Sequence, residues 1–169
     1  AQEIERTGML GNLRELMDHC RETGLLLIHV LIDLEGGTQP RMPTRGPFYA
    51  MVGGGDVCKR GTPGGDIHEA VAPLPGEIKV YKCLFSAFAS SGLQEILDEH
   101  GITDLILTGV STDAVVESTA WDASDRGYST ILAEDCCICG TKELHDQTVS
   151  RMQMRCDVST SKELIDAIA

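Results

Sequence analysis

The sequence predicts a three-layer α/β domain in which helices cover both faces of a mostly parallel sheet. Short apolar runs alternate with amphipathic stretches along the whole chain, and this alternation is typical of strand–helix–strand units joined by right-handed crossovers. The first apolar run is nearly continuous, as expected for a strand covered on both faces. The 169 residues show no internal repeat, low-complexity tract or domain boundary. We therefore expect residues 1–169 to form one domain.

The chain opens with a helix and a buried strand. Met9, Leu13 and Met17 recur at helical spacing, and Gly24 ends that pattern. Residues 25–32 are almost all aliphatic and predict a strand buried on both faces. Residues 35–77 are rich in Gly and Pro and predict one long irregular segment. Segments of that length in a compact domain usually serve a function.

The remaining elements continue the alternation. We predict strands at 78–81, 104–108, 129–133 and 157–159, and helices at 93–100, 113–126, 142–155 and from 162 onward. Gly101 and Gly127 follow two of these helices, as expected of residues that end helices in a left-handed conformation.

Composition excludes several classes of partner. Lys and Arg number 14 against 26 Asp and Glu, a net charge of −12, which argues against nucleic acids and anionic membranes. No apolar run approaches the about 20 residues that span a bilayer, and the first residues resemble no signal peptide. Seven cysteines, an odd number, fit reduced thiols better than a disulfide scaffold. We expect a cytoplasmic protein.

A cysteine cluster raises the question of a metal. Cys136 and Cys139 form a C-x-x-C pattern, but tetrahedral zinc needs a second pair at comparable spacing and none follows. His145 and Cys156 would complete a site only if folding brought them together. We expect no metal and no cofactor, and we interpret these thiols as buried. His29, inside the apolar run, is better explained as a hydrogen-bonded core histidine than as a ligand.

Ligands of parallel sheets bind beyond the carboxyl ends of the strands. The most distinctive such end joins the strand at 104–108 to the next helix through Gly109 and a capping group at Ser111, Thr112 or Asp113. Exposed amides and the positive end of the helix dipole suit a developing oxyanion there, although any strand–helix unit has such a turn. Asp33, at the end of an earlier strand, is either a base or a solvated loop carboxylate.

Several segments together indicate a family. They are Lys82, Ser86-Ala87-Phe88, Thr108-Gly109-Val110-Ser111-Thr112, Val116-Glu117-Ser118-Thr119-Ala120, Asp122-Ala123, Arg126-Gly127-Tyr128 and Asp135. In this order and spacing the chain resembles the isochorismatase-like cysteine hydrolases. These include isochorismatases, nicotinamidases, N-carbamoylsarcosine amidases and ureidoacrylate or biuret amidohydrolases. The resemblance implies hydrolysis of a C–N bond in a small amide or carbamoyl compound, or of a vinyl ether.

The resemblance also implies a catalytic machinery of Asp, Lys and Cys. Lys82 matches the catalytic lysine, and the bond from Val110 to Ser111 matches a cis peptide in the turn. Ala114 and Val115 would supply the amides of an oxyanion hole. The pocket is then expected near Lys82, Phe88 and Val115.

Two parts of that machinery have no match. The nucleophile position falls on Val115, and the family's Asp ends a central strand that precedes the first helix and has no counterpart in this sequence. We therefore expect an impaired or inactive hydrolase, or a non-catalytic descendant that binds a small molecule or a protein. A third reading is an active hydrolase whose nucleophile has moved to Cys136. Without the strand, those at 25–32 and 104–108 have unpaired edges unless they close on each other or a partner fills the gap.

The expected partners are a small-molecule substrate or ligand and further copies of the same chain. Loops of family members commonly pack against neighbouring subunits, which favours a homo-oligomer. Trp121 is either an anchor of such an interface or an ordinary core residue.

Overall fold

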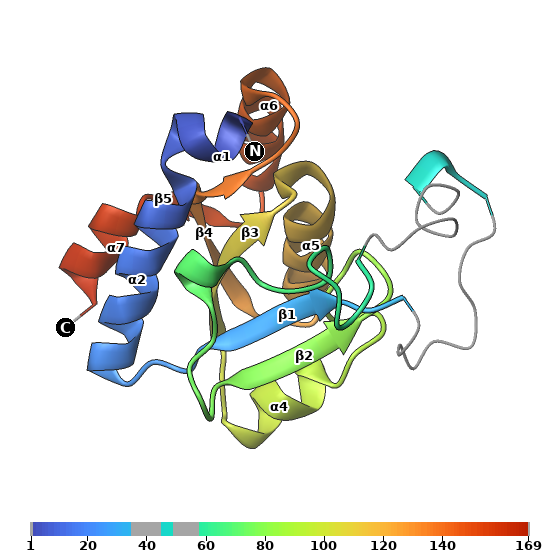
Figure 1. Cartoon of the computed structure of the whole chain (residues 1–169). Coiled ribbons are helices and arrows are strands. Elements are labelled where there is room, and N and C mark those ends of the chain that lie inside the picture. Colours follow the sequence, from blue (N-terminus) through green and yellow to red (C-terminus); the bar gives the residue numbers. More distant parts are fainter. Residues whose placement is uncertain (1, 35–44, 49–57, 169) are drawn as a thin grey trace.

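The computed structural model describes residues 2–34, 45–48 and 58–168, and it has the predicted alternation of helices and parallel strands (Figure 1). The elements are α1 (Gln2–Thr7), α2 (Met9–Thr23), β1 (Ile28–Ile32), the short turn η1 (Glu69–Val71), β2 (Ile78–Lys82), α4 (Leu93–Glu99), β3 (Asp104–Val110), the π-helical turn η2 (Thr112–Val116), α5 (Glu117–Asp125), β4 (Ser129–Ile138), α6 (Lys142–Met152), β5 (Asp157–Ser159) and α7 (Ser161–Ala167). None of the described helices is both long and apolar enough to cross a membrane.

The strands form two separate parallel groups. β1 pairs with β2 from Ile28↔Ile78 to Ile32↔Lys82. In the other group β4 lies between β3 and β5. Within the described residues, no strand joins β1 to β3. The α/β class and the parallel pairing are confirmed.

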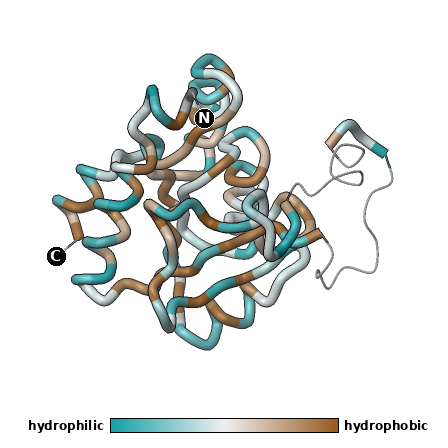
Figure 2. Tube along the Cα trace, in the orientation of Figure 1, coloured by the Kyte–Doolittle hydropathy of each residue, from teal (hydrophilic) through white to brown (hydrophobic). Residues whose placement is uncertain are grey.

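Helices cover two faces of these strands. On one face, Leu16 and Cys20 of α2 and Leu164 of α7 pack against Ala133 of β4. On the other, α4, α5 and α6 pack in two clusters with Val80, Leu132 and their neighbours. Figure 2 shows the longest apolar stretches along the strands, whereas the helices mix apolar and polar residues. The three-layer arrangement follows from this patterning.

Two strands differ from the prediction. The strand expected over 25–32 begins only at Ile28, and it is not buried on both faces, since Val30 is 38% exposed and Leu25 43%. Among the described strands, β1 pairs with β2 alone. β4 is longer than expected and extends through Cys136 and Cys137, which are both buried. Of the long segment at 35–77, the described part contains turns and η1, and the remainder lies outside the described residues.

Candidate functional site

The turn after β3 has an unusual backbone. Gly109 has a φ of 122°, in the region that favours glycine, and the peptide bond between Val110 and Ser111 is cis. The cis bond lies at the position that the family resemblance implied. The chain then enters η2, where the buried Thr112 exchanges a hydrogen bond with His145 of α6 (Oγ1 to Nδ1, 3.0 Å). The turn is therefore anchored to a neighbouring helix.

The amides expected to form an oxyanion hole already have an acceptor. The N–H groups of Ala114, Val115 and Val116 all donate to the carbonyl oxygen of Ser111, at 3.3, 3.0 and 3.1 Å. The wide turn of η2 brings the three donors to one oxygen. A substrate oxygen would therefore have to compete with the Ser111 carbonyl for these amides, and the role expected of Ala114 and Val115 stays a prediction.

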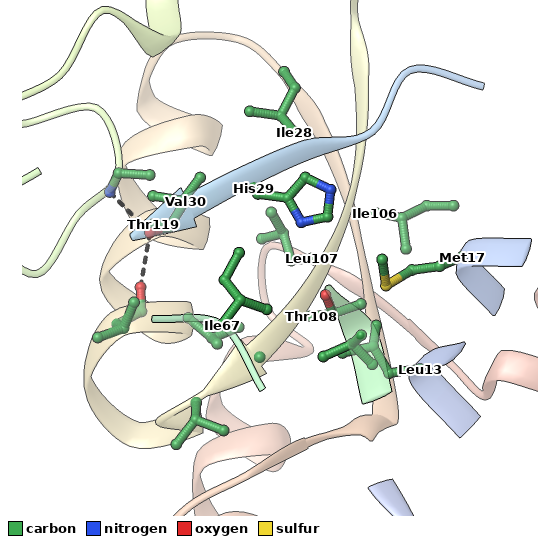
Figure 3. A pocket seen from close by; sticks show the side chains of 16 residues that line it. Leu13, Met17, Ile28, His29, Val30, Ile67, Ile106, Leu107, Thr108 and Thr119 are labelled. Carbon is green, nitrogen blue, oxygen red and sulfur yellow. Dashed lines mark hydrogen bonds between the residues drawn. The ribbon is translucent and has the colours of Figure 1, made fainter. Parts of the chain in front are cut away.

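The backbone of Val115 is hydrogen-bonded to the side chain of Thr119. The Thr119 hydroxyl donates to the Val115 carbonyl (2.7 Å) and accepts from the backbone N–H of Ala87 (3.0 Å), as Figure 3 shows. Next to this bridge, Ser86 Oγ donates to Asp122 of α5 (2.6 Å). These bonds tie the segment after β2 to the helix after the turn, so the two segments that carry the resemblance are in contact.

Lys82, the last residue of β2, is 1% exposed, and its ammonium group donates to the carbonyl oxygen of Phe85. Burial lowers the pKa of Lys82 to about 8. Asp33 lies at the end of the neighbouring strand, and its backbone N–H donates to the Lys82 carbonyl (2.7 Å). Asp33 is 2% exposed, so the reading as a solvated loop carboxylate is wrong. The backbone pairing of β1 and β2 places it beside Lys82.

A cavity of about 300 Å³ opens between residues 28–30 of β1, the carboxyl-terminal part of β3 and the turn (Figure 3). Val115, Val110 and Thr108 line it from one side, and His29 and Val30 from the other. Lys82 and Phe88 are not among the described residues that line this cavity.

Phe88 lies instead in the core. It is 6% exposed and stacks on the ring of Tyr128, with ring centroids 5.6 Å apart. The expected pocket near Lys82, Phe88 and Val115 stays a prediction, and of these three residues only Val115 is among the described residues that line this cavity. The cavity contains Val115 but has the facing edges of β1 and β3 as its walls.

The cysteines lie away from this cavity. Cys136 is fully buried in the cluster with Leu16 and Leu164. Burial, with the nearby charge of Asp135, raises the pKa of the Cys136 thiol far above its usual range. A thiol without access or a thiolate form is a poor nucleophile, and the geometry contradicts a relocated nucleophile at Cys136. Among the described residues, no group of three His, Cys, Asp or Glu side chains could hold a metal ion.

Sequence reasoning missed a charged cluster near the amino end of β1, next to the cavity. Glu77 accepts from Arg21 of α2 (Nε, 2.8 Å) and pairs with His29 (Nε2, 2.8 Å). The Arg21 hydrogen bond is the main cause that lowers the Glu77 pKa to about 2. His29 is the hydrogen-bonded core histidine that was expected. No local sequence pattern predicts this cluster, because Arg21 and His29 are far from Glu77 in the sequence.

Comparison with known proteins shows which family this chain belongs to. The family model of the isochorismatase domain matches residues 1–163. The chain belongs to the isochorismatase family. It is 28% identical to the uncharacterized isochorismatase family protein YddQ of Bacillus subtilis (strain 168) over 82% of this chain and 68% of that protein. It is 29% identical to the maleamate amidohydrolase of Pseudomonas putida over 72% of this chain.

The chain spans 55% of the length of that amidohydrolase. Among solved structures, an isochorismatase-like hydrolase from Alkaliphilus metalliredigens superposes with a TM-score of 0.76 at 26% identity. The match covers 94% of this chain and 82% of that one. Family membership therefore rests on both sequence and fold, and the roles of Lys82 and Val115 stay predictions.

Proposed function

We propose that this isochorismatase-family domain binds a small amide or carbamoyl compound beside Val115 and hydrolyses it poorly or not at all. The proposal rests on the identity of residue 115, which lies at the start of the helix after the cis turn. That position is valine, it lines the cavity, and no cysteine lines the cavity within the described part of the chain.

Hydrolysis of an amide by this fold needs a group that attacks the carbonyl carbon. A thiol at position 115 would lose its proton and add to the carbonyl carbon. The C–N bond would then break and the amine would leave with a proton, and water would hydrolyse the thioester to the acid and the thiol. The isopropyl group of Val115 has no lone pair and no proton to exchange. Loss of a nucleophile typically costs several orders of magnitude in rate.

The other parts of the site suit binding. Lys82 is buried outside the lining of this cavity, so the proposal depends on the cavity lining and not on the Lys82 charge. The cavity is mostly aliphatic, with the Thr108, Thr119 and His29 side chains as polar groups. Sites of this composition select small ligands by shape and by a few polar contacts.

A second candidate is residual hydrolysis of the same class of compound. The similarity to a maleamate amidohydrolase favours it, and Asp33 beside Lys82 offers a carboxylate near the strand ends. In this reading water, activated by a base, takes the place of the thiol.

One experiment separates these functions. Maleamate, ureidoacrylate, biuret, nicotinamide and isochorismate are each incubated with the protein, and ammonia release (loss of the vinyl ether for isochorismate) and thermal stability are recorded. We expect no turnover above background and a rise in Tm with one of the amides. Val115→Trp should fill the cavity and abolish the rise in Tm. Leu74→Ala is the control, because Leu74 does not line the cavity and is 52% exposed, and it should retain the rise in Tm. Turnover at ordinary enzymatic rates by the unaltered protein would reject the proposal.

A further inference from the structure

The turn η2 forms part of the candidate site and is held there by contacts with the rest of the fold. Val115 and Val116 of this turn line the cavity of about 300 Å³. π-helical turns are rare and occur mostly as single turns, often at functional sites. The place of Val115 and Val116 in the cavity wall therefore depends on the contacts that hold η2.

Thr112, the first residue of η2, makes a buried contact with α6. Thr112 is 0% exposed, and its hydroxyl oxygen lies 3.0 Å from Nδ1 of His145. A buried hydroxyl that loses its hydrogen-bond partner destabilises the structure around it. α6 packs against η2 and against the helix α5 that continues it (Figure 1). The hydrogen bond therefore joins the start of the turn to a helix from a later part of the chain.

Two other contacts near this end of the turn do not replace the hydrogen bond of His145. Ser111 donates to Asp113, but both residues belong to the same short segment. Arg151 of α6 pairs with Glu117 at the start of α5 (3.1 Å), but Arg151 is 50% exposed, and exposed ion pairs contribute little. His145 thus provides the buried link between α6 and the start of η2.

His145 is placed by its own helix and not by the turn. Its backbone N–H donates to the Thr141 carbonyl (3.1 Å), and the Thr141 hydroxyl caps α6 by accepting from the N–H of Leu144 (3.2 Å).

His145 also lines a second cavity, of about 290 Å³, at the carboxyl end of β4. The Thr112–His145 hydrogen bond therefore lies between two cavities, one lined by Val115 and Val116 and the other by His145. Because His145 borders open space, a side chain of another shape fits at this position without displacing a tightly packed core.

We propose that His145 is a positioning residue of the cavity beside Val115. Through its hydrogen bond to Thr112 it keeps η2 in the conformation that places Val115 and Val116 in the cavity wall. His145 does not line this cavity itself, so it acts through the turn and not by contact with a ligand. The proposal rests on the proposed function only for the ligand that the cavity binds, and the effect on the turn is measured without a ligand.

Paired substitutions separate the hydrogen bond from the size of the side chain. His145→Leu and Thr112→Val each remove the polar atom, whereas His145→Asn and Thr112→Ser each retain one near the same place. The matched control is His19→Leu. His19 of α2 likewise bonds another segment through its ring (Nε2 to the Ile168 carbonyl, 2.9 Å), but it lines neither of the two cavities.

Amide hydrogen exchange of the full chain distinguishes a local effect on the turn from a general loss of stability. In the unaltered protein the N–H groups of Val115 and Val116 donate to the Ser111 carbonyl, so we expect slow exchange at both. The two variants that remove the bond should speed this exchange about tenfold more than that of Leu132, in the middle strand β4. The two variants that retain a polar atom, and the control, should change this ratio less than about threefold.

Three outcomes would overturn the proposal. Equal acceleration at Val116 and Leu132, or loss of folding in both His145→Leu and Thr112→Val, would mean that the bond only stabilises the whole domain. An unchanged ratio in these variants would mean that other contacts hold the turn, and where only one of them folds, that one decides. Greater acceleration in His145→Asn than in His145→Leu would follow helix propensity, in which leucine exceeds asparagine, and not the hydrogen bond.

The same measurement with maleamate connects the turn with the ligand site. Because a ligand that needs the ordered turn stabilises it, maleamate at about ten times its Kd should slow exchange at Val115 and Val116 about tenfold, in the unaltered protein and in His145→Leu alike. Maleamate that binds by calorimetry without protecting these amides would overturn the role of His145 at the ligand site. Absence of maleamate binding would count against the proposed function for this compound, and the comparison of the variants would still decide whether His145 positions the turn.

Discussion

Glu77→Gln tests the charged cluster that joins α2, β1 and β2. The Glu77 carboxylate, 14% exposed, accepts from Arg21, pairs with His29 and also accepts the N–H of Leu74 (2.8 Å). These contacts lower the Glu77 pKa from 4.5 to about 2. Since the pKa is depressed in the folded state, the cluster stabilises the fold above about pH 4.5 and that stabilisation is lost as the pH falls toward 2.

The size of the effect follows from the shift. A change from 4.5 to about 2, at about 1.36 kcal/mol per pH unit, sets a ceiling of about 3.4 kcal/mol. Solvent reaches part of the carboxylate and screens these contacts, so we expect Glu77→Gln to lower the free energy of unfolding by about 2 kcal/mol at pH 7. At pH 3 the Glu77 carboxyl is largely protonated in the unfolded chain and still mostly ionised in the folded protein, whose pKa is about 2. The unfolded state therefore binds more protons, and the difference should fall to less than about half.

The assay is urea unfolding of both proteins at pH 7 and pH 3. Glu69→Gln is the matched control, because Glu69 is exposed and has the same change in charge. The control should change the free energy of unfolding by less than about 0.5 kcal/mol. Equal losses for the two substitutions, or a Glu77→Gln deficit that is the same at both pH values, would refute the reasoning.

Three other substitutions or labels probe the site. Val115→Cys should produce a thiol that iodoacetamide alkylates, but no amide turnover above background. The reason is that general acid–base assistance, worth about 10²–10⁴-fold, is still missing. Robust turnover would mean that Asp33 or another acid supplies this assistance. Thr119→Val removes the bridge between Val115 and Ala87 and should cost about 1–3 kcal/mol in urea unfolding, since it leaves a buried N–H without an acceptor; an unchanged midpoint would contradict the bridge. Cys136 should stay unmodified by a thiol reagent in the native protein, as read by mass spectrometry, and labelling as fast as in urea would show that it is accessible.

The sequence by itself determined the elements and the family. Helices and strands follow from the spacing of apolar residues and from glycines such as Gly24, whose φ of 75° ends α2. These signals are local, so they need no knowledge of the fold. The family resemblance likewise depends on the order and spacing of segments, and it correctly located the cis bond before Ser111.

Only the tertiary structure decided which groups are exposed, paired or occupied. Asp33 and Cys136 follow strand residues in the sequence, but their burial depends on the neighbouring strand and on helices from both ends of the chain. The amides at Ala114 and Val115 look free in any strand–turn–helix pattern until the wide turn of η2 brings the Ser111 carbonyl to them. Each of these features is set by contacts between distant segments, which local hydrophobic patterns do not encode.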